Sequence, residues 1–233
     1  MKNLLTVILM SVIFYSCDSI KGSGNIVTEK RNVGHFEGIR TPGSIDVEIR
    51  TGDEQAVEVE ADDNVQEYVV VEVSGGSLNV HYKPNMAFMN THTKVFVTTP
   101  SLEKLTASGS GDIISRETIK ADDIIEINVS GSGSINAMVD APTIKAKTSG
   151  SGNITLQGRT KNFECSASGS GDIKCKSLLS EYTDVKTTGS GSAHVYASVK
   201  LKVVSTGSGD IYYSGNPPSP ELRKSGSGEL RAE

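Results

Sequence analysis

The chain has 233 residues, which is enough for one large domain with a buried core. Its formal net charge is −5, with 23 Lys and Arg against 28 Asp and Glu, so no basic excess is available for phosphates and we expect no nucleic-acid partner. Aromatic residues make up 5% of the chain and Trp is absent, which weakens any proposal of stacking on sugars or bases.

The first 17 residues are typical of an export signal. Lys2 is followed by an apolar run that is too short for a stable transmembrane span, and Ser16-Cys17 closes the run. This ending resembles the lipobox of bacterial lipoproteins, in the loose form common in Bacteroidetes. The resemblance implies a signal peptide over residues 1–16, cleavage before Cys17, and acylation of the Cys17 sulfur and new N-terminus. The alternative is a buried N-terminal strand or helix with an incidental cysteine.

Residues 36–100 show the alternation of apolar and polar residues that indicates β-strands. Ser44 to Ile49 and Ala56 to Glu60 alternate with period two, and Gly52-Asp53 supplies a turn between them. Residues 69–82 predict a hairpin and residues 93–98 a further strand. We expect this region to form an irregular N-terminal β cap, or a small opening sheet.

From residue 101 onward a Gly-Ser-Gly triplet recurs, and successive copies begin 18–22 residues apart. A near-constant period of about 20 residues indicates a solenoid or an array. The first glycines of the copies are Gly109, Gly131, Gly150, Gly169, Gly189, Gly207 and Gly226. The second glycines are Gly111, Gly133, Gly152, Gly171, Gly191, Gly209 and Gly228. An outlying copy begins at Gly22.

Alignment of the copies on their first glycine places similar residues in the same slots. Four residues after that glycine stand Ile113, Ile135, Ile154, Ile173, Ala193, Ile211 and Leu230. Four residues before it stand Leu105, Ile127, Ala146, Cys165, Val185, Val203 and Leu222. Alternate positions are apolar or small and those between are polar, which is the strand pattern.

Stacking of these segments would bury each column against its neighbours. We therefore predict an all-β fold, a parallel β-solenoid (β-helix, right-handed) over residues 101–233 that forms one domain with residues 36–100. The glycines are interpreted as structural turn residues, because glycine reaches positive φ without a Cβ clash. A sandwich of antiparallel hairpins would also fit the spacing, but it has no need for identical columns.

The order of features resembles the auto-transporter adhesin head GIN domain family of Bacteroidetes cell-envelope proteins. The residues that carry the resemblance are Phe36-Glu37-Gly38-Ile39, Asp62-Asp63-Asn64, Pro100-Ser101-Leu102 and the serial Ser-Gly-Ser-Gly-Asp-Ile units. The resemblance covers nearly all of residues 30–233. It implies a β-solenoid on an exported, often lipid-anchored protein, and it implies adhesion weakly. It supplies no set of functional residues.

Several residues invite a chemical role, and each has a simpler structural interpretation. The residue after each triplet is often Asp, which suggests a calcium site. However, neutral residues separate most of the carboxylates in this column. Turn residues whose side chains hydrogen-bond to their own backbone explain the pattern more simply. Glycan-cleaving β-helix enzymes need clustered carboxylates. The carboxylates in variable parts of the repeats define no column: Asp122, Asp123, Asp140 and Asp184. The histidines show no metal spacing: His35, His81, His92 and His194.

Cys165 and Cys175 occupy inward slots, so buried free thiols are slightly favoured over a disulfide, which export would allow. Four tyrosines near the C-terminus could form an outward patch for a glycan or protein, although stacking along the strands is the simpler interpretation. They are Tyr182, Tyr196, Tyr212 and Tyr213.

We expect a non-enzymatic lipoprotein with no cofactor and no metal site. Its partners would be the outer membrane, through a lipid anchor on Cys17 followed by a linker over residues 17–35, and a surface protein or glycan. The alternatives are a β-helix polysaccharide lyase or hydrolase, and a structural envelope protein without a dedicated ligand.

Overall fold

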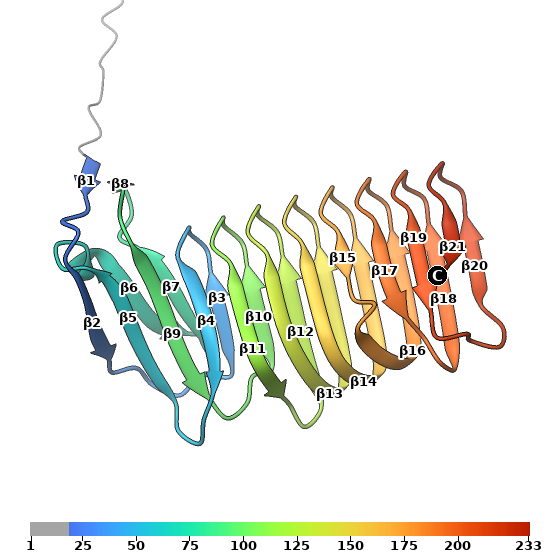
Figure 1. Cartoon of the computed structure of the whole chain (residues 1–233), viewed down its shortest axis with the longest axis horizontal. Coiled ribbons are helices and arrows are strands. Elements are labelled where there is room, and N and C mark those ends of the chain that lie inside the picture. Colours follow the sequence, from blue (N-terminus) through green and yellow to red (C-terminus); the bar gives the residue numbers. More distant parts are fainter. Residues whose placement is uncertain (1–18) are drawn as a thin grey trace, which may run out of the picture.

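The computed structural model describes residues 19–233. This part of the chain is all-β, with 59% strand and stacked parallel coils that form a β-solenoid of about 6 turns (Figure 1). The strands of the N-terminal region are β1 (Ser19–Lys21), β2 (Ile26–Arg31), β3 (Gly38–Thr41), β4 (Asp46–Thr51), β5 (Ala56–Asp62), β6 (Val69–Ser74), β7 (Ser77–Tyr82), β8 (Ala87–Met89) and β9 (Thr93–Thr99), with a short 3-10 helix, η1 (Gln66–Tyr68). The repeat region contains β10 (Lys104–Ala107), β11 (Ile113–Lys120), β12 (Ile124–Val129), β13 (Ile135–Thr148), β14 (Ile154–Ala167), β15 (Ile173–Lys174), β16 (Leu178–Thr187), β17 (Ala193–Tyr196), β18 (Lys200–Ser205), β19 (Ile211–Ser214), β20 (Glu221–Lys224) and β21 (Leu230–Ala232).

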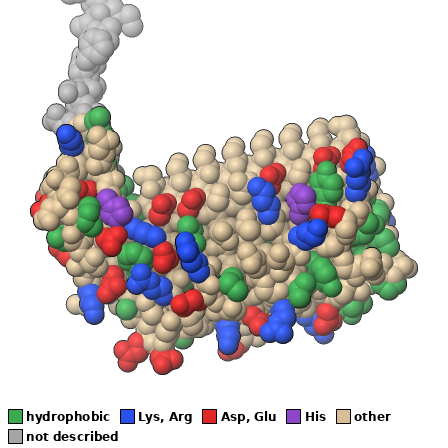
Figure 2. All heavy atoms as spheres, in the orientation of Figure 1, with side chains coloured by type: hydrophobic (Ala, Val, Ile, Leu, Met, Phe, Trp, Pro, Cys, Tyr) green, Lys and Arg blue, Asp and Glu red, His purple; other side chains and the backbone are tan. Residues whose placement is uncertain are grey.

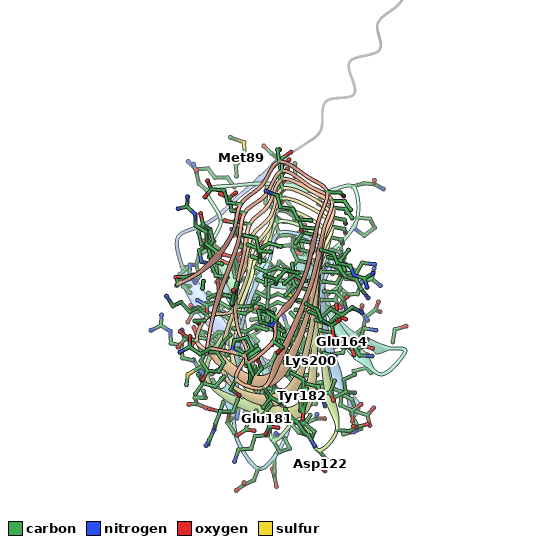
Figure 3. All side chains as sticks on the ribbon, turned by 90° about the vertical axis from the view of Figure 1, so that its right-hand side faces the viewer. Met89, Asp122, Glu164, Glu181, Tyr182 and Lys200 are labelled. Carbon is green, nitrogen blue, oxygen red and sulfur yellow. The ribbon has the colours of Figure 1, made fainter. Side chains whose placement is uncertain are left out.

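Each coil crosses two faces that meet at a sharp corner, as the end-on view in Figure 3 shows. Face A contains β7, β3, β10, β12, the second halves of β13 and β14, β16, β18 and β20. Face B contains β9, β4, β11, the first halves of β13 and β14, β15, β17, β19 and β21. All of these neighbours pair in parallel, which confirms the solenoid and excludes the sandwich of hairpins.

The N-terminal end of the stack is closed by antiparallel strands. β5 pairs antiparallel with both β9 and β2, and β6 pairs antiparallel with β7. β3 and β4 instead pair in parallel with β10 and β11, so the repeat region and the N-terminal region share one sheet. The expected domain boundaries themselves stay a prediction.

The strand registers are those that the alignment of the triplets gives. Ile113 pairs with Ile135, Ile135 with Ile154 and Ile154 with Ile173, and all four are buried. The column four residues before the triplet is also in register, from Leu105 onward. Both columns belong to the apolar core of the solenoid, in which each side chain packs against those of the neighbouring coils.

The unequal spacing of the copies has a local cause. The first spacing is the longest because β11 carries a bulge between Ser115 and Thr118 relative to β13, and the bend before β12 adds a further residue. Such extra residues are not paired in the sheet, and the residues on either side of them keep their strand pairing. The corner and the buried columns therefore stay aligned although the repeat length varies.

Candidate functional site

The corner is held by a ladder of backbone hydrogen bonds that repeats from copy to copy. The carbonyl oxygen of Gly109 accepts the N–H groups of Ser132 and Gly133 of the next copy, at 2.9 and 3.0 Å. The carbonyl of Gly131 accepts Ser151 and Gly152 in the same way, at 3.1 Å each. One carbonyl therefore satisfies two N–H groups at each step as far as Gly169, and the corner forms a hydrogen-bonded ridge along this part of the molecule.

The triplet glycines are needed because successive coils approach closely at this corner. A Cβ on Gly150 would lie 2.1 Å from the carbonyl oxygen of Gly131, and one on Gly152 would lie 1.8 Å from that of Gly133. None of the triplet glycines of the repeats has positive φ, so the expectation that they provide left-handed turns is wrong. Their role is to leave room for the neighbouring backbone.

The polar residue after each triplet forms a second ladder. The N–H of Ser134 donates to Asp112 Oδ1 at 2.7 Å, that of Asn153 to Ser134 Oγ at 3.1 Å, and that of Asp172 to Asn153 Oδ1 at 2.9 Å. These side chains bond the next coil's backbone rather than their own, which corrects the sequence interpretation. These hydrogen bonds account for the Asp, Asn and Ser residues of the column without calcium, since all three have an acceptor oxygen on a short side chain.

The corner at Gly43 was not predicted from the sequence. Gly43 occupies the place of Gly109 in the preceding coil, and its carbonyl accepts the N–H groups of Ser110 and Gly111 at 2.9 and 3.0 Å. Here Ile45 stands where the repeats have their second glycine, and the Gly-Ser-Gly pattern is lost. No triplet stacks below this coil, and a Cβ on Gly43 would meet only His81 at 3.9 Å.

The outlying triplet at residues 22–24 does not join the corner. Gly24 has a φ of +82° and its N–H donates to Asp62 Oδ1 at 2.7 Å. Ser23 donates through its hydroxyl to Asp63 Oδ1 at 2.6 Å. This triplet is a latch that fastens the N-terminal segment to the end of β5.

The latch depends on ionised carboxylates. The N–H groups of His92 and Gly24 donate to Asp62, which is buried, and hold the pKa of its carboxyl below the ordinary value of 3.8. A lowered pKa means that the latch stabilises the protein above the ordinary pKa, and that this stabilisation is lost as pH falls through the lower folded-state pKa.

We expect Asp62→Ala to free residues 19–25 for proteolysis while the repeats stay folded. The native protein should lose the latch below pH 3.8, and the variant should lack that part of the acid dependence. Limited proteolysis and melting curves between pH 2 and 7 measure both effects. Asp122→Ala, in the exposed bend before β12, is the control. Equal cleavage of the two variants within residues 19–25 would contradict this role for Asp62.

The carboxylates considered for catalysis do not converge. Asp122 and Asp123 lie in the bend opposite the corner, and Asp140 is on face B (Figure 3 labels Asp122). Asp184 lies on face A, where Glu164 is its neighbour across β14 and β16. Among residues 19–233, no three His, Cys, Asp or Glu side chains gather in a group that could hold a metal ion.

The cysteines of the repeat region are free thiols and both are buried. Burial raises the pKa of the Cys175 thiol to about 12 and also raises that of Cys165, so neither is activated as a nucleophile. Cys17, the expected lipidation site, lies outside the described residues together with the whole expected signal peptide. In the part of the chain that the structure covers, no helix has the length and apolar character needed to span a bilayer.

The C-terminal tyrosines do not gather into one patch. Tyr182 is exposed on face A, whereas Tyr212 on face B stacks on His194 with ring centroids 4.6 Å apart. Tyr213 packs partly against the core. The stack of Tyr212 on its neighbour in the next coil agrees with the simpler interpretation of these residues.

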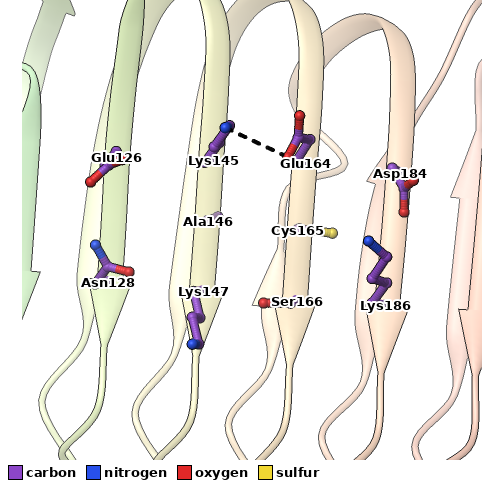
Figure 4. A pocket seen from close by; sticks show the side chains of 10 residues that line it. All are labelled: Glu126, Asn128, Lys145, Ala146, Lys147, Glu164, Cys165, Ser166, Asp184 and Lys186. Atoms are coloured by element: carbon purple, nitrogen blue, oxygen red, sulfur yellow. Dashed lines mark ion pairs between the residues drawn. The ribbon is translucent and has the colours of Figure 1, made fainter.

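Face A presents two parallel rows of outward side chains, both visible in Figure 4. Row 1 is Asn79, Arg40, Thr106, Asn128, Lys147, Ser166, Lys186, Val204 and Arg223. Row 2, two residues away along each strand, is Lys104, Glu126, Lys145, Glu164, Asp184, Lys202 and Glu221. Alternation along the strands predicted that these residues point outward, but only the registers reveal the rows.

Row 2 carries three lysines and four carboxylates, and each lysine is paired with a carboxylate of the row. Lys104 pairs with Glu126 at 3.3 Å, Lys145 with Glu164 at 3.9 Å and Lys202 with Asp184 at 3.5 Å. The adjacent carboxylates of Glu164 and Asp184 therefore each have a lysine on the other side. Face B differs, because charged side chains gather toward its two ends and its middle coils expose uncharged residues such as Asn136, Thr155 and Gln157 (Figure 2).

Comparison with known proteins identifies the family of the chain. The model of the family described as "Putative auto-transporter adhesin, head GIN domain" matches residues 35–217. The chain belongs to this family. The match covers most of the mature chain that the sequence predicts, including both faces and the corner, and it confirms the resemblance noted from the sequence. No curated protein matches the chain.

Solved structures share the fold over more than nine-tenths of this chain. A "putative adhesin" from Bacteroides fragilis is 20% identical, with a TM-score of 0.87 over 92% of this chain and 100% of that chain. A second from Parabacteroides distasonis is 28% identical, with a TM-score of 0.75 over 93% and 100%. A "putative lipid binding protein" from P. distasonis is 26% identical, with a TM-score of 0.75 over 92% and 100%. The first of these shows the fold alone.

Proposed function

We propose that this protein is an acylated cell-envelope lipoprotein whose solenoid faces act as a non-enzymatic scaffold for a surface protein or glycan. The observation that carries the proposal is the stack itself. It holds outward side chains in straight rows on a backbone fixed by hydrogen bonds at every coil. A rigid face of this kind binds without an ordering cost to its own backbone. Membership of an adhesin family and the expected acylation of Cys17 support the same role.

Protease shaving of intact cells tests surface display. We expect the chain, carrying an epitope tag at its C-terminus, to be cleaved from intact cells while a periplasmic marker protein stays whole. Cys17→Ala should move the protein from the membrane fraction to the soluble fraction, because acyl chains supply the anchor. Protection of the wild-type chain, alongside cleavage of a known surface protein, would exclude a role in adhesion.

A polysaccharide-cleaving enzyme is the second candidate, and the adjacent carboxylates of Glu164 and Asp184 are the observation that favours it. Their pairing with Lys145 and Lys202 favours an ion-pair ladder instead. Incubation with acidic and neutral polysaccharides, followed by measurement of new reducing ends, separates the two. Turnover that Glu164→Gln abolishes would replace the scaffold proposal with an enzymatic one.

A further inference from the structure

Row 1 of face A carries four cations and no carboxylate. Arg40, Lys147, Lys186 and Arg223 are all exposed. Within residues 19–233, none of the four has a carboxylate within the 4.0 Å of an ion pair, whereas Lys104, Lys145 and Lys202 of row 2 each have one. The protein as a whole has a net charge of −5, so this line of free cations runs against its overall charge.

The last three cations of row 1 stand two coils apart, with one uncharged residue between each pair. Ser166 separates Lys147 from Lys186, and Val204 separates Lys186 from Arg223. Neighbouring strands lie about 4.8 Å apart, so each of these pairs of cations is separated by about 10 Å along the solenoid axis. The spacing limits repulsion between the cations when no ligand is present.

The part of row 1 from Asn79 to Lys186 also lies in a trough. One hollow of about 320 Å³ is lined by Lys147, Ser166 and Lys186 together with residues of row 2 (Figure 4). A second, of about 680 Å³, continues it toward the N-terminal end past Arg40. The two hollows share Glu126 and Asn128, so an extended ligand could lie across both.

We propose that this trough binds a linear anionic glycan that carries one carboxylate or sulfate in every disaccharide and lies along the solenoid axis. Its charged groups would meet Lys147 and Lys186 in the trough and Arg223 beyond its end, and its hydroxyls would reach Asn128 and Ser166. A glycan of this kind repeats its charge over every second sugar, as the cations repeat over every second coil. The proposal rests on the scaffold role and names the class of ligand.

A flat anionic membrane fits this face less well. The carboxylates of Glu126, Glu164, Asp184 and Glu221 stand in row 2 only two residues away from row 1. A surface wide enough to touch row 1 would also meet those carboxylates with its anionic groups, whereas a single glycan chain can place its charged groups over row 1 and its uncharged hydroxyls toward row 2. Repulsion from row 2 would then keep the chain in register with the trough.

Hyaluronan oligosaccharides, which have one carboxylate in each disaccharide, are the probe, and neutral dextran is the comparison. We expect the soluble mature chain to bind hyaluronan and not dextran. The logarithm of the association constant should fall linearly with the logarithm of the NaCl concentration. Lys147→Gln/Lys186→Gln should weaken binding by about tenfold, since two exposed contacts with anionic groups are lost.

The matched control is Lys120→Gln/Lys174→Gln, which removes the same charge from exposed positions of β11 and β15 on face B, outside both hollows. We expect less than a twofold change for the control and unchanged melting temperatures for both variants. The proposal is overturned if hyaluronan fails to bind, if both variants lose affinity equally, or if vesicles rich in phosphatidylglycerol bind more tightly than the oligosaccharide. Surface display would stand in each of these cases, because protease shaving tests it independently.

Discussion

Replacement of Gly150 by Ala is expected to lower the free energy of unfolding by about 3 kcal/mol, at the upper end of the usual cost of overpacking. The new Cβ would lie 2.1 Å from the carbonyl oxygen of Gly131, and the atoms it meets are backbone, which cannot rotate away. Relief requires the two coils to separate, which lengthens the hydrogen bonds from Ser151 and Gly152 to the same carbonyl. Chemical denaturation followed by circular dichroism measures the change.

Two controls isolate the close approach as the cause. Gly34→Ala makes the same chemical change at an exposed position with no atom within 4 Å of the new Cβ, and it should be neutral or slightly stabilising. Ser151→Ala alters the exposed tip of the same corner, where its side chain has no hydrogen-bond partner among residues 19–233, and should also be nearly neutral. A Gly150→Ala variant as stable as these two would refute the steric role of the corner glycines.

The sequence was sufficient for the repeat architecture because stacking makes each coil copy its neighbours. Ile135, Ile154 and Ile173 occupy one slot in the alignment and one column in the structure. The reason for the glycines was not accessible in the same way. Glycine is used both for positive φ and for close approach, and only the position of the neighbouring carbonyl distinguishes them.

Prediction from the sequence was weakest where the Gly-Ser-Gly motif does not correspond to the contacts made in the structure. Residues 43–47 form a corner without the second glycine, because no triplet lies beneath them. Residues 22–24 have the triplet but form a latch, because Asp62 and Asp63 fasten them elsewhere. A short motif therefore predicts a corner only when its neighbours in the stack have the same motif.

The candidate site on face A was only half predictable. Alternation along each strand identifies Lys147 and Lys186 as outward residues, but they are 39 positions apart in the chain and two coils apart in space. The repeat length varies between them, so their alignment depends on the extra residue inserted before β16. Which lysines are free and which are paired depends on side-chain contacts that a sequence does not contain.

Truncation of a buried isoleucine should cost most in the middle of the stack. Ile154 is fully buried between Ile135 and Ile173, so Ile154→Ala removes contacts on both sides and leaves a cavity that rigid ladders prevent from collapsing. We expect a loss of about 3 kcal/mol in the free energy of unfolding. Leu230, in the same column, is only partly buried and pairs with Ile211 alone, so Leu230→Ala should cost about 1 kcal/mol.

The two variants should also differ in how they unfold. Because each coil contacts only its neighbours, damage at Ile154 weakens the link between the two halves of the stack, whereas damage at Leu230 frays one end. Hydrogen exchange should therefore rise across β13, β14 and β15 in Ile154→Ala, and only across β19, β20 and β21 in Leu230→Ala. If the stack unfolds as one indivisible unit, exchange will rise uniformly in both variants, and the account of the fold as a chain of nearest-neighbour contacts will be wrong.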